Sequence, residues 1–280
     1  MPAMTALCAL QLALIGGGNM ARGLIGGLVA KGANPDRITV AEPDAGGRDS
    51  LQRSFGVRVT ADNAEAIAAA QVVVLAVKPQ VMANVVRALA PTLQQSRPLV
   101  ISVAAGIRVT NLQAWTGAGV AVVRCMPNRP ALIGAGATGL YADASVTVAE
   151  RALAEQVLAS TGLALWVPHE SDIDLVTALS GSGPAYFFRL AESMAEAAIA
   201  QGLDATVARQ LAAQTLAGAG QLVAAEAAPD LAHMRAAVTS KGGTTEAALQ
   251  RFAALGLDTT VAAAMQAAAA RSLELAEQFG

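Results

Sequence analysis

Short apolar runs recur through the first half of the chain at intervals typical of alternating strands and helices. The runs at 71–77 and 99–103 are continuous Val, Leu, Ile and Ala, which indicates strands buried on both faces, as in a parallel sheet. The full set of predicted strands is 10–15, 38–41, 57–59, 71–77, 99–103, 120–124 and a last apolar run at 163–167. The pattern predicts an α/β N-terminal domain over 1–166.

The second half has a different pattern, which is that of helices. From Ser171 to Phe279 the chain is rich in Ala and is divided by Gly202, by Pro229 and by the pair Gly242–Gly243. One long helix is expected over 184–200, with Pro184 at the first turn, where proline is tolerated. We therefore expect an all-helical domain over 167–280.

The composition of the chain indicates a large buried surface. Of the 280 residues, 54% are hydrophobic and 14% charged, and small residues crowd 211–225, which lets helices approach closely. A charge-poor chain of this kind often covers its apolar surface in an oligomer. We expect the helical domain to form an intertwined homodimer; the alternative is a monomeric bundle.

Charge and hydropathy exclude several classes of function. A net charge of −2 provides no footprint for nucleic acid, and no apolar run reaches the roughly 18 residues that span a bilayer. Residues 1–14 are apolar but lack a basic start, so we interpret them as leading into a strand rather than as a signal peptide. Two cysteines, Cys8 and Cys125, cannot build a disulfide framework or a metal site, and a cytoplasmic protein is expected.

A glycine motif follows the first predicted strand. Residues 16–21 read Gly-Gly-Gly-Asn-Met-Ala, which is the G-x-G-x-x-A pattern, and a helix is expected over 21–31. The first glycine permits the tight turn, the second lets the backbone approach a pyrophosphate, and the small third residue lets helix and strand pack closely. With a strand before it and a helix after it, the motif predicts dinucleotide binding.

Further coenzyme contacts are expected at the ends of later strands. Glu42 follows the second strand, where a carboxylate hydrogen-bonds the ribose 2′-hydroxyl of NAD, but Arg48 and Arg53 could receive the 2′-phosphate of NADP. The choice between NADH and NADPH stays open. Lys78–Pro79 and Ala104–Gly106 end two other strands and should lie beside the coenzyme.

The segment 238–245, Val-Thr-Ser-Lys-Gly-Gly-Thr-Thr, interrupts the helical half. Adjacent glycines cost about 1 kcal/mol each in a helix interior, so a helix must end there and another begin at Thr244. A glycine turn that opens a helix directs several N–H groups at one point, which suits a phosphate or carboxylate. The segment alone is equally compatible with an ordinary capped loop.

Several motifs together resemble the pyrroline-5-carboxylate reductase family. The two most specific are Ala178-Leu-Ser-Gly-Ser-Gly-Pro-Ala-Tyr186 and the segment 238–245. The glycine loop, Ala76-Val77-Lys78-Pro79, Ala104-Ala105-Gly106 and the sequence Arg-Cys-Met-Pro-Asn at 124–128 match in the same order. The resemblance covers nearly the whole chain.

The resemblance implies reduction of 1-pyrroline-5-carboxylate to L-proline by NADPH or NADH, the last step of proline biosynthesis. It implies a swapped helical dimer, often assembled into larger rings. It implies that Thr245 is catalytic, bonding the ring nitrogen. It implies that the substrate is held by Ser240, Gly242, Gly243, Thr244, Thr245 and Glu170, and the coenzyme by Gly16, Gly18, Asn19, Met20, Asn63, Ala76, Val77, Lys78, Pro79 and Ala105. Glu42 is added to the coenzyme-binding residues from its position after the second strand.

Three positions depart from the family pattern. Lys241 replaces the usual proline beside the carboxylate site, and Arg129 stands where threonine is common, close to the expected nicotinamide end. Ala41 occupies a position that often holds a serine in contact with the 2′-phosphate. The third departure, next to Glu42, bears on the choice of coenzyme.

The scarcity of titratable side chains favours imine over carbonyl reduction. Reduction of a ketone needs a general acid for the developing alkoxide, and the candidates His169, His233, Tyr141 and Tyr186 are each better explained as structural. A protonated cyclic imine is already electrophilic, so positioning suffices.

Two alternatives remain from the residues alone. One is a related two-domain NAD(P)-dependent dehydrogenase or imine reductase acting on another small carboxylic acid. The other is a non-catalytic dinucleotide-sensing protein, which would not need the hydroxyl-rich turn at 238–245.

Overall fold

The computed structural model describes residues 7–279, which divide into two compact units. The first comprises the described residues up to 182 together with those from 268 onward, and the second comprises 183–267. The boundary expected between residues 166 and 167 lies inside the first unit. The reason is that the short helix α8 (Asp172–Val176) packs on the sheet and is tied to the end of the chain.

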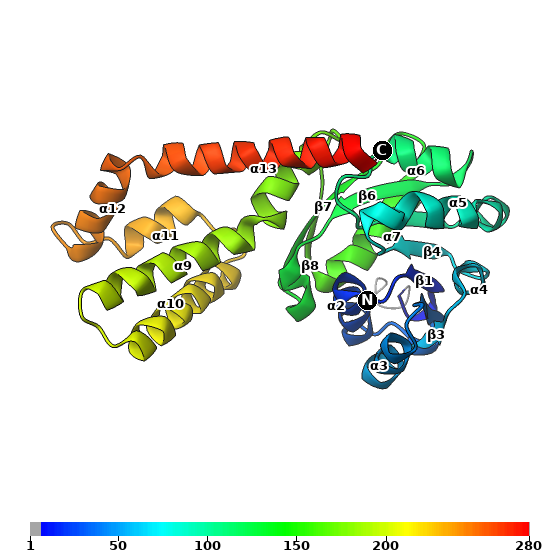
Figure 1. Cartoon of the computed structure of the whole chain (residues 1–280), viewed down its shortest axis with the longest axis horizontal. Helices are drawn as coiled ribbons and strands as arrows, with labels where there is room; N and C mark the ends of the chain where they lie inside the picture. Colours follow the sequence, from blue (N-terminus) through cyan, green and yellow to red (C-terminus); the bar gives the residue numbers. More distant parts are fainter. Residues whose placement is uncertain (1–6, 280) are drawn as a thin grey trace. The chain divides into compact units, whose positions relative to one another are not determined.

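An eight-stranded sheet forms the first unit (Figure 1), in the order β3-β2-β1-β4-β5-β6-β7-β8. All neighbours are parallel except β6 and β7, which are antiparallel. The strands are β1 Leu12–Ile15, β2 Ile38–Ala41, β3 Arg58–Thr60, β4 Val72–Leu75, β5 Leu99–Ser102, β6 Val122–Met126, β7 Gly136–Tyr141 and β8 Gly162–Trp166. The parallel strands β1–β6 and their crossover helices are the Rossmann-like arrangement that the apolar runs predict.

Helices cover both faces of this sheet. On one face α2 (Asn19–Ala30), α3 (Ala45–Phe55) and α7 (Val148–Leu158) bury side chains against β1, β4, β5 and β6. On the other face lie α4 (Asn63–Ile67), α5 (Pro79–Ser96) and α6 (Val109–Thr116). Alternate residues of each strand point to opposite faces of the sheet. Because helices cover both faces, β1 and β4 are buried along their whole lengths.

The chain before β1 differs from its predicted form. Residues 1–6 of the segment interpreted as leading into a strand lie outside the described residues, while Leu7–Ala9 are helical and β1 begins only at Leu12. Leu7 and Leu10 pack into the core on the α2 face. The apolar character of residues 7–10 therefore reflects burial of a helical turn rather than strand pairing.

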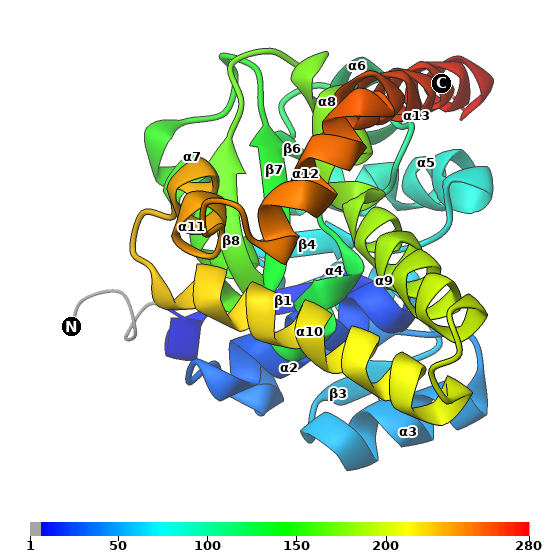
Figure 2. The ribbon, with the colours of Figure 1, turned by 90° about the vertical axis from the view of Figure 1, so that its left-hand side faces the viewer.

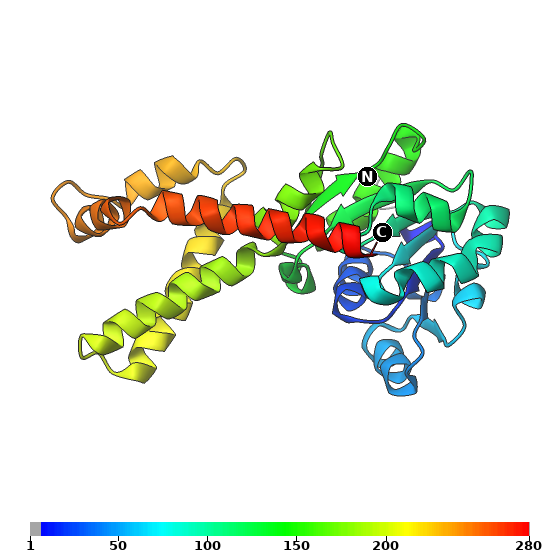
Figure 3. The ribbon, with the colours of Figure 1, turned by 45° about the horizontal axis from the view of Figure 1, so that its top comes forward.

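The second unit consists of helices. They are α9 (Gly183–Ala200), α10 (Ala205–Ala225), α11 (Leu231–Ala237), α12 (Thr244–Ala254) and the first part of α13 (Leu257–Phe279). Helices α9 and α10 lie side by side (Figures 1 and 3). The breaks at Gly202, Pro229 and Gly242–Gly243 fall where the sequence predicts them.

A further break, at Gly256, separates α12 from α13 (Figure 2). Gly256 has φ 75°, a conformation that costs glycine little and other residues more, and the two helices meet at 57°. Over residues 7–279 no single helix is long and apolar enough to cross a membrane, whereas α12 and α13 taken together meet the criteria of length and composition.

The helical unit leaves large apolar side chains uncovered. Phe187 and Phe188 of α9 are 61% and 62% exposed, and Leu211 and Leu222 of α10 are 57% and 62% exposed. Isolated apolar residues on a surface are ordinary, but two helices that present several of them together are typical of an interface.

Candidate functional site

The first glycine of the motif brings two strand ends together. Gly16 follows β1 with φ 99°, its N–H donates to the carbonyl of Ala41 at 2.9 Å, and Ala76 N–H donates to the carbonyl of Ile15 at 2.9 Å. A Cβ on Gly16 would lie 2.9 Å from the carbonyl oxygen of Ala76. Only glycine satisfies both the positive φ and the close approach. The loops after β1 and β4 therefore lie against one another at the carboxyl edge of the sheet.

Gly17, which fills the variable position between the two glycines of the motif, packs against the end of β2. Its N–H donates to Oε2 of Glu42 at 2.9 Å, and a Cβ there would lie 2.6 Å from Cδ1 of Leu51. The other carboxylate oxygen of Glu42, Oε1, accepts the N–H of Asp44 at 3.0 Å. The half-buried carboxylate of Glu42 is thus fixed directly behind the glycine loop.

Gly18, the second glycine of the motif, faces open space. It is the N-cap of α2, supplies no side-chain cap, and no atom lies within 4 Å of the position that its Cβ would take. Asn19 is exposed and Met20 half-buried in the first turn of α2. The first N–H groups of a helix lack partners within the helix and carry a partial positive charge. This end of α2 is therefore suited to a pyrophosphate.

The remaining coenzyme-binding residues expected from the sequence lie on loops at the same edge of the sheet. Ala76, Val77 and Lys78 connect β4 to α5, with Lys78 exposed as the N-cap and Pro79 at the first helical position. Half-buried Ala105 lies on the loop after β5, and half-buried Asn63 begins α4 after β3. The structure brings these loops to one edge because β1–β5 are parallel.

Two arginines lie near Glu42, and both have partners. Arg48 Nη1 donates to the carbonyl oxygens of Glu42 and Pro43 at 2.7 and 2.8 Å. Arg22 Nη1 donates to Ser50 Oγ at 3.1 Å. Arg48 therefore holds the β2–α3 loop in place, whereas Arg22 joins α2 to α3. Arg53, the other arginine considered from the sequence, is exposed in the last turn of α3.

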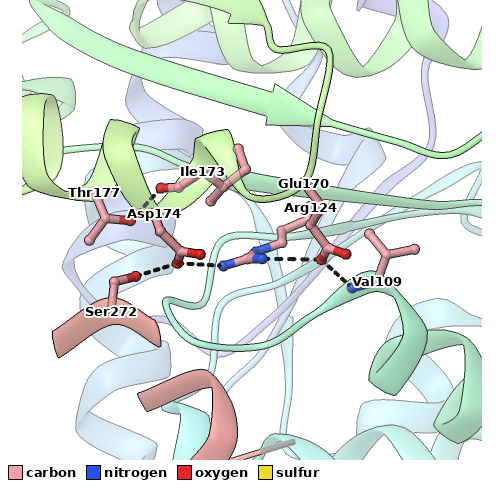
Figure 4. Close-up of polar contacts among 7 residues, drawn as sticks. All are labelled: Val109, Arg124, Glu170, Ile173, Asp174, Thr177 and Ser272. Atoms are coloured by element: carbon pink, nitrogen blue, oxygen red, sulfur yellow. Dashed lines mark hydrogen bonds and ion pairs between the residues drawn. The ribbon is translucent and has the colours of Figure 1, made fainter. Parts of the chain in front are cut away.

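A buried ionic network around Arg124 of β6 was not predicted from the sequence (Figure 4). Arg124, whose side chain is 2% exposed, places Nη1 3.1 Å from Oε1 of Glu170 and Nη2 3.6 Å from Oδ1 of Asp174. Ser272 Oγ donates to the same oxygen of Asp174 at 2.6 Å. The one sequence signal for this network was an arginine within an apolar strand, since a buried charge requires partners. The partners themselves could not be identified, because they are far from Arg124 in the sequence.

Glu170 has a structural task in this network. Its Oε1 accepts from Arg124 and also from the N–H of Val109, the first residue of α6, at 2.7 Å. The sequence resemblance implies a substrate contact for Glu170. In the structure one of its carboxylate oxygens is committed to Arg124 and to the start of α6.

The family signature at 178–186 contains a π-helical turn. Residues Thr177–Gly181 are π-helical, with Ser182 N–H donating to the carbonyl of Thr177 at 2.8 Å, and Asn128 Nδ2 donates to the carbonyl of Ser180 at 3.0 Å. Turns of this kind occur frequently at functional sites. Asn128 also accepts from the N–H of Ala137 at 2.9 Å, so it joins the loop after β6 to the signature and to β7.

The glycine turn in the second unit opens α12 without a side-chain cap. Gly242 has φ 73°, and its N–H donates to Oε2 of Glu246 at 2.6 Å. Gly243 N–H donates to the carbonyl of Ser240 at 3.0 Å. Two of the backbone donors expected to bind a carboxylate thus have internal acceptors, and the first intrahelical bond begins only at Ala247. This leaves the N–H groups of the first helical turn directed outward.

The hydroxyl groups expected at this turn lie close to it. Ser240 is exposed, and its Oγ lies so near Gly243 that no Cβ could be accommodated there. Thr244 is exposed and Thr245 half-buried, at the first two positions of α12. Lys241, one of the departures from the family pattern, is exposed beside them.

The other residues considered as proton donors or nucleophiles are placed as structural or surface groups. His169, His233 and Tyr186 are exposed and Tyr141 is half-buried. Burial raises the pKa of the Cys125 thiol far above its ordinary value, although the charge of Arg124 lowers it in part. Within residues 7–279 no cluster of three or more His, Cys, Asp or Glu could hold a metal ion.

The two remaining departures from the family pattern differ in burial. Arg129 is exposed at the start of a 3-10 turn after β6, whereas Ala41 is buried at the end of β2. A side chain at position 41 therefore faces the core. The side chain at the end of β2 that lies beside the glycine loop is that of Glu42.

Two family models match the chain. Residues 170–275 match the model described as pyrroline-5-carboxylate reductase dimerisation, and residues 11–106 match the model described as NADP oxidoreductase, coenzyme F420-dependent. The first covers α8, the π-helical turn, the helical unit and α13 as far as residue 275, and the second covers the glycine loop and the strands β1–β5.

Curated relatives and solved structures agree along nearly the whole chain. Pyrroline-5-carboxylate reductase of Pseudomonas aeruginosa is 49% identical over 271 residues, covering 96% of this chain and 98% of the relative. That of Vibrio alginolyticus is 43% identical, with the same coverage. The structure of a pyrroline-5-carboxylate reductase from Coxiella burnetii matches with a TM-score of 0.90 at 39% identity, covering 95% of this chain and 98% of the other. The Plasmodium falciparum enzyme with NADP bound matches with a TM-score of 0.80 at 25% identity, covering 96% and 99%.

Proposed function

The chain belongs to the pyrroline-5-carboxylate reductase family, and we propose that it reduces 1-pyrroline-5-carboxylate to L-proline with NADPH or NADH, the final step of proline biosynthesis. The observation that carries the proposal is the pair of open helix N-termini, α2 after the glycine loop and α12 after Gly242–Gly243. A dinucleotide pyrophosphate and a substrate carboxylate are both anions, and each suits one of these ends.

The coenzyme, when bound, supplies a hydride. In the proposed reaction this hydride adds to the carbon of the C=N bond, and the ring nitrogen becomes the amine of proline. The chain's own task at the sheet is to bind and orient. We assign this to Gly16 and Gly18 at the pyrophosphate, Asn19 and Met20 in the first turn of α2, and Glu42 and Asn63 at the adenosine end. Ala76, Val77, Lys78, Pro79 and Ala105 would line the remainder of the coenzyme.

At the turn of the second unit, we assign the substrate carboxylate to the backbone of Gly242, Gly243 and Thr244 with the hydroxyl of Ser240. Because the N–H groups of Gly242 and Gly243 have internal acceptors, the outward donors of the first turn of α12 are the ones ready to bind it. Substrate that also engaged Gly242 would have to displace the carboxylate of Glu246.

Thr245 is assigned to the ring nitrogen. Half-buried Thr245 is the second residue of α12, next to the residues assigned to the carboxylate. A hydroxyl can accept a hydrogen bond from a protonated imine or donate one to the product amine. No strong acid is required, because the protonated imine is electrophilic before hydride arrives, so the chemistry rests on positioning. We propose that Glu170, a substrate contact by the resemblance, acts through Arg124, from which its Oε1 accepts a hydrogen bond.

We propose that the helical unit forms the homodimer, and that dimers assemble further into a ring. The exposed apolar side chains of α9 and α10 support the first part. Light scattering coupled to gel filtration distinguishes monomer, dimer and ring. Both cysteines are unpaired, which suits the reducing cytoplasm that we propose as the compartment.

Steady-state kinetics with 1-pyrroline-5-carboxylate, with NADH and NADPH in parallel, tests the proposed reaction. A panel of ketoacids under the same conditions tests the related dehydrogenase. We expect coenzyme oxidation with the cyclic imine and little with the ketoacids. Oxidation with a ketoacid alone would identify a dehydrogenase, and tight coenzyme binding without turnover of any substrate would identify a sensor.

Thr245→Val tests the role of the hydroxyl, because valine keeps the branched shape and removes only the oxygen. We expect kcat to fall by about 10²-fold or more, because the ring nitrogen is no longer held in position for hydride transfer and misplacement of a reacting group costs about that much, while the Kd of the coenzyme is unchanged. Thr259→Val, at an exposed position of α13, is the matched control and should leave kcat unchanged. Turnover of Thr245→Val near the original rate would remove Thr245 from the mechanism.

A further inference from the structure

The carboxylate of Glu42 occupies a fixed position at the carboxyl end of β2. One oxygen accepts the N–H of Gly17 at 2.9 Å and the other accepts the N–H of Asp44 at 3.0 Å. With both oxygens held by backbone N–H groups on either side, the side chain cannot swing away without leaving two donors unsatisfied. The negative charge therefore stays beside the glycine loop.

In a fold of this topology the adenosine ribose lies at the end of the second strand, with the pyrophosphate at the start of the first crossover helix. Gly17 belongs to the pyrophosphate loop, so its hydrogen bond to Glu42 places the carboxylate between the two subsites. A carboxylate accepts hydrogen bonds from the ribose hydroxyls of NADH. It repels the dianionic 2′-phosphate of NADPH.

The neighbouring groups do not reverse this preference. Residue 41 is a buried alanine, so it offers no hydroxyl to a phosphate. The Nη1 atom of Arg48 donates to the carbonyl oxygens of Glu42 and Pro43, which hold its guanidinium on the loop backbone. The guanidinium of Arg22 donates to Ser50 Oγ and to the carbonyl oxygen of Gly47, so it is held on α3. Asp44, whose Oδ2 caps α3 through the N–H of Gly47 at 2.6 Å, adds a second negative charge to the same loop.

We propose that this chain selects NADH over NADPH and that Glu42, held in place by the Gly17 N–H, is the residue that discriminates. The proposal rests on the coenzyme-binding part of the proposed function. It concerns only the adenosine end of the coenzyme and does not depend on which imine or acid is reduced.

Coenzyme binding without substrate tests the proposal directly. The Kd values of NADH and NADPH are measured by fluorescence titration of the full-length protein. Calorimetric titration with ADP and with 2′,5′-ADP isolates the adenosine end. We expect NADH to bind at least about tenfold more tightly than NADPH, which corresponds to about 1.4 kcal/mol. Equal or tighter binding of NADPH would overturn the proposal.

Glu42→Gln is the informative variant, because the amide oxygen can still accept the Gly17 N–H while the charge, together with the acceptor of the Asp44 N–H, is removed. We expect the ratio of the two Kd values to shift towards NADPH by about tenfold, again about 1.4 kcal/mol. Asp49→Asn removes the same charge from an exposed position on α3 and is the control for long-range electrostatics. A ratio that is unchanged in Glu42→Gln, or shifted equally in Asp49→Asn, would contradict the assignment.

The outcomes separate this proposal from the proposed function. If NADH binds selectively but 1-pyrroline-5-carboxylate is not reduced, the coenzyme assignment stands and the reaction is wrong. If the imine is reduced with NADPH and NADH bound equally, the reaction stands and Glu42 is not a discriminator.

Discussion

Removal of Arg124 should destabilise the sheet unit far more than removal of the charge of its acidic partner Asp174. The network contains one arginine and two carboxylates, so its net charge is negative and Arg124 is its only cation (Figure 4). Arg124→Met would leave Glu170 and Asp174, 19% and 6% exposed in their side chains, facing one another without a counter-charge. Loss of one partner from a buried ion pair typically costs about 3–5 kcal/mol.

Asp174→Asn should behave differently, because it leaves Arg124 and Glu170 as a neutral pair. The asparagine oxygen can still accept the hydroxyl of Ser272, which donates to Asp174 at 2.6 Å. The ion-pair distance to Arg124 Nη2 is 3.6 Å, and that nitrogen has no hydrogen-bond partner in residues 7–279. We therefore expect a cost of about 1 kcal/mol, the scale of one altered hydrogen bond.

Urea unfolding followed by tryptophan fluorescence measures both variants, since Trp115 and Trp166 lie in the sheet unit. Arg53→Met is the control, because Arg53 is exposed on α3, and we expect a change within about 0.5 kcal/mol. The double variant Arg124→Met/Asp174→Asn should cost less than the sum of its parts, because it relieves one unpaired charge. The reasoning fails if Asp174→Asn is as destabilising as Arg124→Met, or if Arg124→Met behaves like the control.

Three further outcomes are expected. Gly18→Ala should leave the free energy of unfolding within about 0.5 kcal/mol of the original, because no atom beyond the adjoining residues lies within 4 Å of the new Cβ. The variant should bind the coenzyme more weakly in a titration, because the methyl group enters the pyrophosphate position. Unaltered binding would argue against that position. Lys241→Pro should retain activity and raise the free energy of unfolding by up to about 1 kcal/mol, because Lys241 does not lie at positive φ. Complete loss of kcat would show that the lysine has a catalytic task. Burial raises the pKa of the Cys125 thiol, so this cysteine should not react in the native protein. Mass spectrometry should show that iodoacetamide modifies exposed Cys8 in the native protein and Cys125 only after unfolding. Rapid modification of native Cys125 would contradict its burial.

Local pattern was sufficient to predict the parallel strands and the glycine loop. Continuous Val and Leu runs mark β4 and β5 because both faces of these strands are covered by helices. The glycine loop could be predicted because positive φ at Gly16 and close approach to Ala76 leave one residue type possible.

The strand β7 could not be predicted in the same way. It begins with Gly136 and contains Gly139, and glycine weakens a strand. The structure explains both residues: a Cβ on Gly139 would lie 2.8 Å from the side chain of Val176, and one on Gly136 would lie 2.9 Å from the carbonyl oxygen of Thr161. The glycines are required by tertiary contacts that no local pattern reveals.

The site was predicted only in part, because some of its contacts are tertiary contacts that no local pattern reveals. The residues at the ends of β1, β2 and β4 are adjacent because parallel strands place their carboxyl ends at one edge. The hydrogen bond from Gly17 to Glu42, the commitment of Glu170 to Arg124 and the bond from Gly242 to Glu246 each depend on side-chain geometry. Spacing along the sequence does not determine such contacts.

Transfer of deuterium from coenzyme to product tests the central claim most directly. The protein is incubated with 1-pyrroline-5-carboxylate and NADH or NADPH that carries deuterium at C4 of the nicotinamide, and the product is analysed by mass spectrometry and NMR. The account predicts L-proline that carries deuterium at C5, formed in equal amount to the oxidised coenzyme. Coenzyme oxidation without labelled proline, or no oxidation in the presence of this imine, would contradict it.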